Sequence, residues 1–195
     1  MSESFKFNDE NLAKAKKIIA RYPQGRQHSA VLPLLDLAQR QNNNYASDAV
    51  VDAVAAMLDM PRIRVMECAT FYTMINRKPV GKYHLQCCTT TPCWLRGSSE
   101  VVDAMKKHLG IGFGETTKDG TFSMLEVECL GACVNAPIVQ INDDFYEDLD
   151  AASIVRILKA LQAGTPPAPG PQIDRQASAP VGGPTTLKDI EMAKG

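Results

Sequence analysis

Two short cysteine pairs constrain this chain more than any other feature of its sequence. Cys88 and Cys93 form a C-x4-C pair, and Cys129 and Cys133 form a C-x3-C pair. A zinc knuckle uses a tighter C-x2-C spacing, in which two sulfurs close on one ion. A [2Fe–2S] cluster instead divides four cysteines between two irons, and plant-type ferredoxins also use a C-x4-C element. The spacing therefore predicts an iron–sulfur centre held by two loops.

Other uses of these cysteines stay open at this point. Structural zinc would need the same four thiolates, and a redox dithiol normally needs C-x-x-C, which neither pair has. Buried cysteines are often inert packing residues, but four of them in two polar loops would be unusual. Disulfides are disfavoured because the chain is 45% hydrophobic and needs no covalent staples.

Cys87 lies next to Cys88, so the ligand has to be chosen. Using Cys87 would stretch the first pair to C-x5-C, and strand alternation makes it a small core residue. Cys68 lies among apolar residues of an expected helix and is also interpreted as packing. Arg96 and the start of a helix near Ser98 follow the first pair, and both would bring positive charge toward the centre.

Composition and motifs exclude several function classes. The net charge of -1 and the lack of a basic, aromatic-rich segment argue against nucleic-acid binding. No stretch approaches the roughly 20 apolar residues of a membrane helix, and the polar start does not resemble a signal peptide. The run Gly110–Gly114 resembles G-x-G-x-x-G but has Glu115 at the third required glycine and follows a helix. A Rieske centre is not expected, because the three histidines lie outside any Cys/His loop.

Residues 1–80 are predicted to form a small helical bundle. Asn8 and Ser47 are suitable N-caps, and Pro61 suits a first helical turn. Apolar residues then recur at helical spacing. The four expected helices carry Leu12, Ile18 and Ile19; Leu32, Leu35 and Leu37; Val50, Val54 and Leu58; and Val65, Cys68, Ala69 and Tyr72.

Residues 81–163 are predicted to form an α/β domain of the thioredoxin type. Ser98 is expected to cap a helix that Gly110 ends, and Asp150 is expected to cap the last helix. The order β-α-β-β-β-α fits a layered α/β architecture. The expected strands are 83–87, 122–129, 138–141 and 145–146.

Residues 164–195 are predicted to be an extended tail. Proline and glycine make up 11 of these 32 residues, a share typical of segments without a core of their own.

Several runs of this sequence resemble one known family. They are Cys88-Thr-Thr-Thr-Pro-Cys93-Trp-Leu-Arg-Gly97, Gly114-Glu-Thr-Thr, Val127-Glu-Cys129-Leu-Gly-Ala-Cys133-Val-Asn-Ala-Pro137, and upstream Tyr22-Pro23, Leu37-Ala-Gln-Arg40 and Ala69-Thr-Phe-Tyr-Thr-Met74. Together they resemble the thioredoxin-like [2Fe–2S] subunit of NADH:quinone oxidoreductase, respiratory complex I, over nearly the whole chain. Cys87 departs from the family, which usually has an aliphatic residue there.

The resemblance implies a fold and a role. It implies an N-terminal helical bundle and a thioredoxin-like domain in which Cys88, Cys93, Cys129 and Cys133 hold one [2Fe–2S] cluster. It also implies a tight partner, the flavin subunit, which binds FMN and NADH, and a neighbouring large iron–sulfur subunit. The expected activity is therefore that of a subunit of NADH dehydrogenase, with no NADH oxidation by the isolated chain.

The same resemblance gives a location and an alternative. The expected place is peripheral, on the cytoplasmic face of a bacterial inner membrane or the matrix side of the mitochondrial one, without membrane insertion. The alternatives are the small subunit of an NAD-linked hydrogenase or formate dehydrogenase, and a stand-alone thioredoxin-like ferredoxin.

Overall fold

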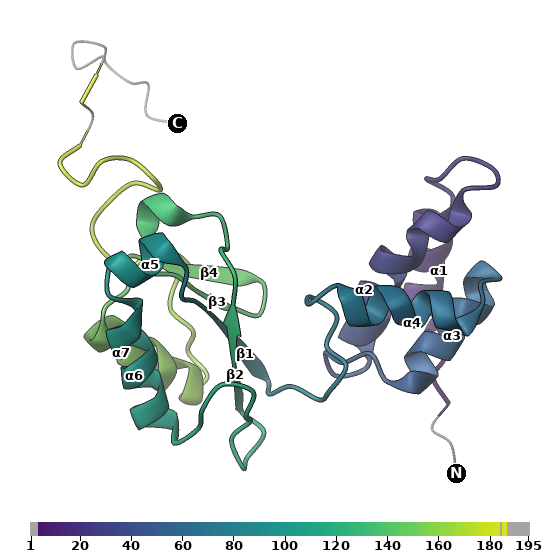
Figure 1. Ribbon diagram of the computed structural model, residues 1–195, viewed down its shortest axis with the longest axis horizontal. Coiled ribbons are helices and arrows are strands. Elements are labelled where there is room, and N and C mark those ends of the chain that lie inside the picture. The colour runs from purple at the N-terminus through teal and green to yellow at the C-terminus, as the bar shows by residue number, and fades with distance from the viewer. Residues whose placement is uncertain (1–3, 184, 187–195) are drawn as a thin grey trace. The chain divides into compact units, whose positions relative to one another are not determined.

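The chain divides into two compact units, residues 1–80 and residues 81–195. A computed structural model describes residues 4–183 and 185–186 (Figure 1). Each unit has its own apolar core. The first is helical, and the second packs helices on a mixed sheet, which confirms the α/β class expected from the sequence.

Four α-helices form the first unit, with a 3-10 turn, η1 (Gln27–Ala30), before the second. The Asn8 side chain accepts a hydrogen bond from the Asn11 amide, and the Ser47 hydroxyl accepts one from the Val50 amide, so both predicted N-caps are confirmed. Pro61 lies at the N-cap of the fourth helix and not inside its first turn. The helices are α1 (Asp9–Ile19), α2 (Val31–Gln41), α3 (Asp48–Leu58) and α4 (Arg62–Phe71).

A buried glutamine ties this bundle to the segment that follows α4. The Gln39 amide nitrogen donates to the Met74 carbonyl at 3.0 Å, and its oxygen accepts from the Asn76 amide at 3.0 Å. Both polar ends of the buried side chain are therefore satisfied, which keeps its burial from being costly.

The second unit is built on a five-stranded sheet in the order β2-β1-β3-β4-β5. β1 pairs parallel with β2 and antiparallel with β3, β3 pairs antiparallel with β4, and β4 pairs parallel with β5. The strands are β1 (Tyr83–Cys88), β2 (Phe122–Val127), β3 (Val139–Ile141), β4 (Asp144–Glu147) and β5 (Gly170–Pro171).

Two long helices, α6 (Ser98–Leu109) and α7 (Ala151–Gln162), lie side by side against the sheet (Figure 1). Asp150 and Ser153 form a capping box at the start of α7, as the sequence predicts. Gly110 ends α6 with a φ of 69°. Ser98 is not the cap of α6, because it is the first helical residue and Gly97, with a φ of 94°, precedes it.

Strand alternation decides which residues of the sheet face these helices. Leu85 lies opposite Met124 in the β1–β2 register, and both are in the core with Phe122. Leu125 and Val127 fall on the alternate face and are only half-buried. β2 ends at Val127, two residues earlier than predicted, so Cys129 lies in a loop.

Other segments of the chain pair with the first half of the β2 edge and with β4. Beside β2, the Gly114 amide donates to Met124, the Thr117 amide donates to Phe122, and Thr116 bridges Ser123. Beside β4, the short β5 comes from the segment predicted as a tail. The described residues after α7 therefore return to the second unit (Figure 1).

Gly81 lies against the backbone of β2, where no larger residue fits. A Cβ atom at this position would come within 2.6 Å of the Phe122 carbonyl carbon and 2.7 Å of the Ser123 nitrogen. Because backbone atoms cannot rotate away, Gly81→Ala is expected to lower the free energy of unfolding by about 1–3 kcal/mol, the usual range for overpacking. Chemical denaturation of the two proteins measures this difference.

Gly182→Ala is the matched control for this substitution. A Cβ at Gly182 meets no atom within 4 Å, so this variant should unfold at the same denaturant concentration as the unaltered chain. Equal stability of the two alanine variants would contradict the close approach at Gly81.

Candidate metal centre

Strand direction brings the two cysteine loops together. Cys88 is the last residue of β1 and pairs with Val127, the last residue of β2. Because β1 and β2 are parallel neighbours, the segments that leave them begin at the same edge of the sheet. Cys129 follows β2 in a loop, and all six cysteines of the chain are free thiols.

The other cysteine of each pair lies on a short helical turn. Cys93 is on α5 (Thr91–Leu95), and Cys133 begins the 3-10 turn η2 (Cys133–Asn135). Cys88 and Cys93 are buried, whereas Cys129 is exposed and Cys133 is partly exposed. The centre therefore has one inner pair of sulfurs and one outer pair.

Within each pair the sulfurs lie close together. Cys129 Sγ and Cys133 Sγ are 3.3 Å apart, and the Cys93 thiol hydrogen-bonds the Cys88 sulfur. Among the described residues, no group of three or more His, Cys, Asp or Glu side chains is clustered as a site for a single metal ion. The cysteines are thus arranged as two pairs.

The thiols of each pair are influenced by groups of the other loop. The Leu130 backbone, in the second loop, contributes to lowering the pKa of Cys88 in the first. The Thr90 hydroxyl is 3.2 Å from Cys88 Sγ and also hydrogen-bonds the Cys129 sulfur. Each loop therefore supplies a hydrogen-bonding group to a sulfur of the other.

Further backbone amides point at sulfur within each half of the site. The Gly131 amide donates to Cys129 Sγ at 3.4 Å, and its φ of 85° is one that glycine adopts without strain. The Ile138 amide donates to the Cys93 sulfur. Such N–H···S bonds stabilise negative charge on sulfur, and this is the property that a metal–thiolate centre needs.

The pKa values of the four thiols divide within each pair. Burial raises the pKa of Cys88, but hydrogen bonds from the Thr90 side chain and backbone outweigh burial and leave it below the ordinary value. The Gly131 amide, and after it the Cys133 thiol, lowers the pKa of Cys129. One sulfur of each pair is therefore prepared to be a thiolate, the form that binds metal.

The partner thiols shift the other way. Burial, and then hydrogen bonding to Cys88, raises the pKa of Cys93 to about 12. Cys133 has a raised pKa because its thiol donates to Cys129. A bound cation at the centre would replace these shared protons, since metal ligands must be deprotonated.

Cys87 lies on the opposite face of β1 from Cys88. Its sulfur is 3.7 Å from Met105 Sδ in the core under α6. Burial, followed by the charge of Glu126, raises the pKa of this thiol to about 12. Cys68 belongs to the first unit, where it packs against the helical core. Cys87 therefore lies on the face of β1 away from Cys88.

The positive charge near the sulfurs comes from groups other than the start of the helix near Ser98. α5 intervenes between Cys88 and α6, and Arg96 is the exposed C-cap of that short helix. The amides of Leu130, Gly131 and Ile138 provide positive dipoles at the sulfurs instead. Sequence reasoning missed α5 because a Thr-Pro start was the only local signal for a five-residue helix.

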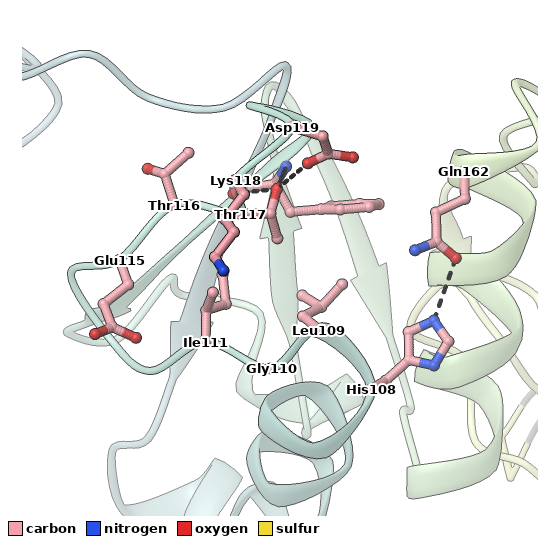
Figure 2. A pocket seen from close by; sticks show the side chains of 11 residues that line it. His108, Leu109, Gly110, Ile111, Glu115, Thr116, Thr117, Lys118, Asp119 and Gln162 are labelled. Carbon is pink, nitrogen blue, oxygen red and sulfur yellow. Dashed lines mark hydrogen bonds between the residues drawn. The ribbon is translucent and has the colours of Figure 1, made fainter.

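The start of the glycine run after α6, Gly110 and Ile111, lines the cavity in Figure 2, which has a volume of about 770 Å³. The Gly110 amide donates to Lys106, the Gly112 amide to the Glu115 carboxylate and the Gly114 amide to Met124. No amide of these three glycines is left for a phosphate, and the negative end of the α6 dipole faces this side. These amides are therefore not arranged as a phosphate cradle.

Other polar groups around this cavity are also paired. His108 lies 3.3 Å from Gln162 Oε1, and Asp119 accepts from the Thr117 hydroxyl (Figure 2). Asp119 also accepts from the Thr121 hydroxyl. His84 lies on β1 with Nδ1 2.8 Å from the Ser123 hydroxyl. These two histidines therefore lie on secondary-structure elements and not in a Cys/His loop.

Three large apolar side chains next to the cysteines in sequence are exposed. Trp94 and Leu95 follow Cys93 and are 62% and 70% exposed, and Val134 follows Cys133 and is 69% exposed. Exposed large apolar side chains beside a candidate site are suited to contact with another molecule. In the part of the chain that the structure describes, no helix has the length and apolarity required to span a membrane.

Comparison with known proteins identifies the relatives of this chain. A sequence model of the family described as thioredoxin-like [2Fe–2S] ferredoxin matches residues 15–162. NADH dehydrogenase [ubiquinone] flavoprotein 2, mitochondrial, of Dictyostelium discoideum is 51% identical over 183 residues, 94% of this chain and 74% of that protein. A subunit of the NADH-quinone oxidoreductase of Rickettsia bellii is 55% identical over 159 residues, 82% of this chain and 95% of that protein.

A solved structure supports the fold. The H2-reduced NAD+-reducing [NiFe]-hydrogenase aligns with a TM-score of 0.60 at 21% identity, over 69% of this chain. The aligned region spans 23% of that hydrogenase chain. At this identity the likeness concerns the fold alone.

Proposed function

The chain belongs to the thioredoxin-like [2Fe–2S] ferredoxin family, and from this premise we propose that four cysteines hold one [2Fe–2S] cluster: Cys88, Cys93, Cys129 and Cys133. The observation that carries the proposal is the meeting of the two cysteine pairs at one edge of the sheet. Two sulfurs for each of two irons is the ligand division that such a cluster requires.

The surrounding groups fit an anionic cluster. Cys88 and Cys129 already have lowered pKa values. The hydrogen-bonding groups near the sulfurs are the Thr90 hydroxyl and the amides of Leu130, Gly131 and Ile138. When bound, the cluster supplies reversible one-electron transfer. The part played by this chain is to hold the ligands, to donate hydrogen bonds to them and to keep the inner pair away from water.

We further propose that the chain is the electron-transfer subunit of an NADH dehydrogenase module. Its relatives at 51% and 55% identity are named as subunits of NADH dehydrogenases, and they cover most of the chain. The glycine run has no free amide for a dinucleotide phosphate. FMN and NADH are therefore assigned to a flavin subunit, with a large iron–sulfur subunit as a second neighbour.

The exposed apolar side chains around the centre support a partner at this place. Trp94, Leu95 and Val134 would leave water when a second subunit covers the cysteine loops. This contact would also bring a redox group of the partner close to the outer sulfurs. In this proposal the assembled complex is peripheral, on the cytoplasmic face of a bacterial inner membrane or on the matrix side of a mitochondrial one.

The alternative is a small subunit of an NAD-linked hydrogenase or formate dehydrogenase. The hydrogenase likeness at 21% identity supports only the shared fold. The two NADH dehydrogenase relatives have more than twice that identity and match over more of the chain. We therefore favour the NADH dehydrogenase role over this alternative.

Metal and sulfide analysis tests the proposed centre directly. Anaerobically purified chain is expected to contain two iron and two acid-labile sulfide atoms, the content of one [2Fe–2S] cluster. After reduction it should give a low-temperature EPR signal of one unpaired spin per chain. Zinc without labile sulfide would contradict the proposal and would favour a structural zinc site.

A further inference from the structure

A buried ion pair joins the segment after α7 to the short loop between β4 and α7. The Arg175 side chain is 6% exposed and the Asp148 side chain 4%, with Nη1 3.0 Å from Oδ1. Arg175 Nε and Nη2 also donate to the Ala179 carbonyl at 2.9 and 2.6 Å. Every nitrogen of the guanidinium therefore has an acceptor in a place that excludes water.

The same arginine reaches the second cysteine loop. Arg175 Nη1 donates to the Val134 carbonyl at 3.4 Å, and Val134 directly follows Cys133. The Asp148 amide donates to the Asn135 carbonyl at 2.7 Å. Both members of the ion pair are thus bonded to the backbone of η2.

Asn135 makes a second connection between the tail segment and η2. Its side chain is buried, and Nδ2 donates to Glu147 Oε2 at 2.5 Å and to the Ala177 carbonyl at 3.1 Å. The Gln172 amide donates to the Glu147 carbonyl at 3.0 Å, which continues the pairing of β5 with β4. We refer to residues 170–179 as the strap.

We propose that Arg175 is a positioning residue for the cluster ligand Cys133, acting through the strap and η2. This inference rests on the proposed function, because it takes Cys133 as a ligand. Contacts outside the ligands orient them, and their loss typically weakens metal sites by about 10–100-fold. The inner pair lies on β1 and α5, whereas the outer loop has no strand or long helix to fix it. The strap provides that support.

The chemistry of arginine explains why this residue suits the task. A planar guanidinium can bond a carboxylate and two backbone carbonyls at the same time, whereas an ammonium group is a single charged point. Arg175→Lys should therefore keep an ion pair with Asp148 but lose the simultaneous bonds to Ala179 and Val134. Arg175→Ala should lose all of them and leave Asp148 buried without a partner.

The test uses purified full-length protein with its cluster. Transfer of iron to an excess chelator, followed by visible absorption, is expected to be about 10-fold faster in Arg175→Lys than in the unaltered chain. The EPR and visible circular dichroism spectra of the cluster should also shift. Limited proteolysis should cut the strap faster in the variant.

Ile157→Val is the matched control, because it loosens the buried core of α7 without touching the strap or η2. The EPR and visible spectra of Ile157→Val should match those of the unaltered chain. Its cluster should also be lost at the same rate as in the unaltered chain, when each protein is measured at the same number of degrees below its own melting temperature. Arg175→Lys decides the outcome if Arg175→Ala does not fold.

Two results would overturn the inference in distinguishable ways. If the unaltered chain binds iron and sulfide but Arg175→Lys behaves like Ile157→Val, Arg175 supports only the stability of the domain. If the unaltered chain binds no iron or sulfide, the proposed function fails and this inference fails with it.

Discussion

Cys88→Ser is expected to remove the visible absorption of the purified chain and most of its iron. The Cys88 sulfur is 3.2 Å from the Thr90 hydroxyl of its own loop, and the Leu130 backbone of the other loop contributes to lowering its pKa. A serine hydroxyl is a harder ligand than a thiolate and does not ionise in the same range, so it suits an iron–sulfur centre poorly. Iron and sulfide content, together with the visible absorption spectrum, measures the effect.

Cys87→Ser is the control for this substitution, because Cys87 is the neighbouring residue in the sequence. Cys87 Sγ packs against Met105 on the far side of β1, so its loss should leave iron content near that of the unaltered chain. The buried hydroxyl of the new serine would lower the free energy of unfolding. It would leave the amount of bound cluster unchanged. Loss of the cluster in Cys87→Ser with retention in Cys88→Ser would reverse the proposed ligand assignment.

The isolated chain is expected to show no NADH-dependent reduction of a dye. The glycine run that resembles a dinucleotide motif uses its amides on Lys106, Glu115 and Met124, and the Glu115 carboxylate occupies the Gly112 amide where a phosphate would bind. With no hydride acceptor of its own, a one-electron centre cannot receive the electron pair of NADH. Addition of the flavin subunit should create the activity.

A chemical reductant serves as the control for this experiment. Dithionite should reduce the centre of the isolated chain, seen as bleaching of its visible absorption, and so show that the centre is competent while NADH leaves it oxidised. Dye reduction by NADH with the isolated chain alone would contradict the assignment of NADH binding to a partner.

Much of the fold could be predicted because its limits are set by local chemistry. Asn8, Ser47 and Asp150 each cap the helix predicted from them, and Gly110 ends α6. A capping side chain acts within three residues of its own position, so the signal is present in the sequence itself. The strand starts at Tyr83 and Phe122 follow in the same way from short apolar runs.

The errors fall where distant segments decide the outcome. The predicted strand 122–129 makes its core contacts through Phe122 and Met124, whereas Leu125 and Val127 are only half-buried. The alternation of apolar and polar residues alone does not tell which face of a strand the helices will cover. β5 was missed because a Gly-Pro pair has no strand propensity and pairs only because β4 offers an edge.

In the candidate site, too, local features could be predicted from the sequence and contacts between distant segments could not. The cysteine spacing predicted two loops, and in the structure both cysteine segments follow neighbouring parallel strands, with Cys88 at the end of β1 and Cys129 two residues after β2. The groups that hydrogen-bond the sulfurs could not be predicted, since the Leu130 and Ile138 amides are set by backbone geometry and carry no side-chain signal. The ligand assignment itself stays a prediction for the experiments above.

The coverage of both sheet edges has a consequence for how this protein assembles and stays dispersed. An open edge strand is a template for pairing with other chains and a common start of aggregation. Here the segment 114–117 occupies one edge, and Pro171, which has no amide hydrogen to offer, occupies the other. Strand addition by a neighbour is therefore blocked at residues 122–124 of β2 and along β4, so a partner at these places has to be recognised by side-chain shape and charge.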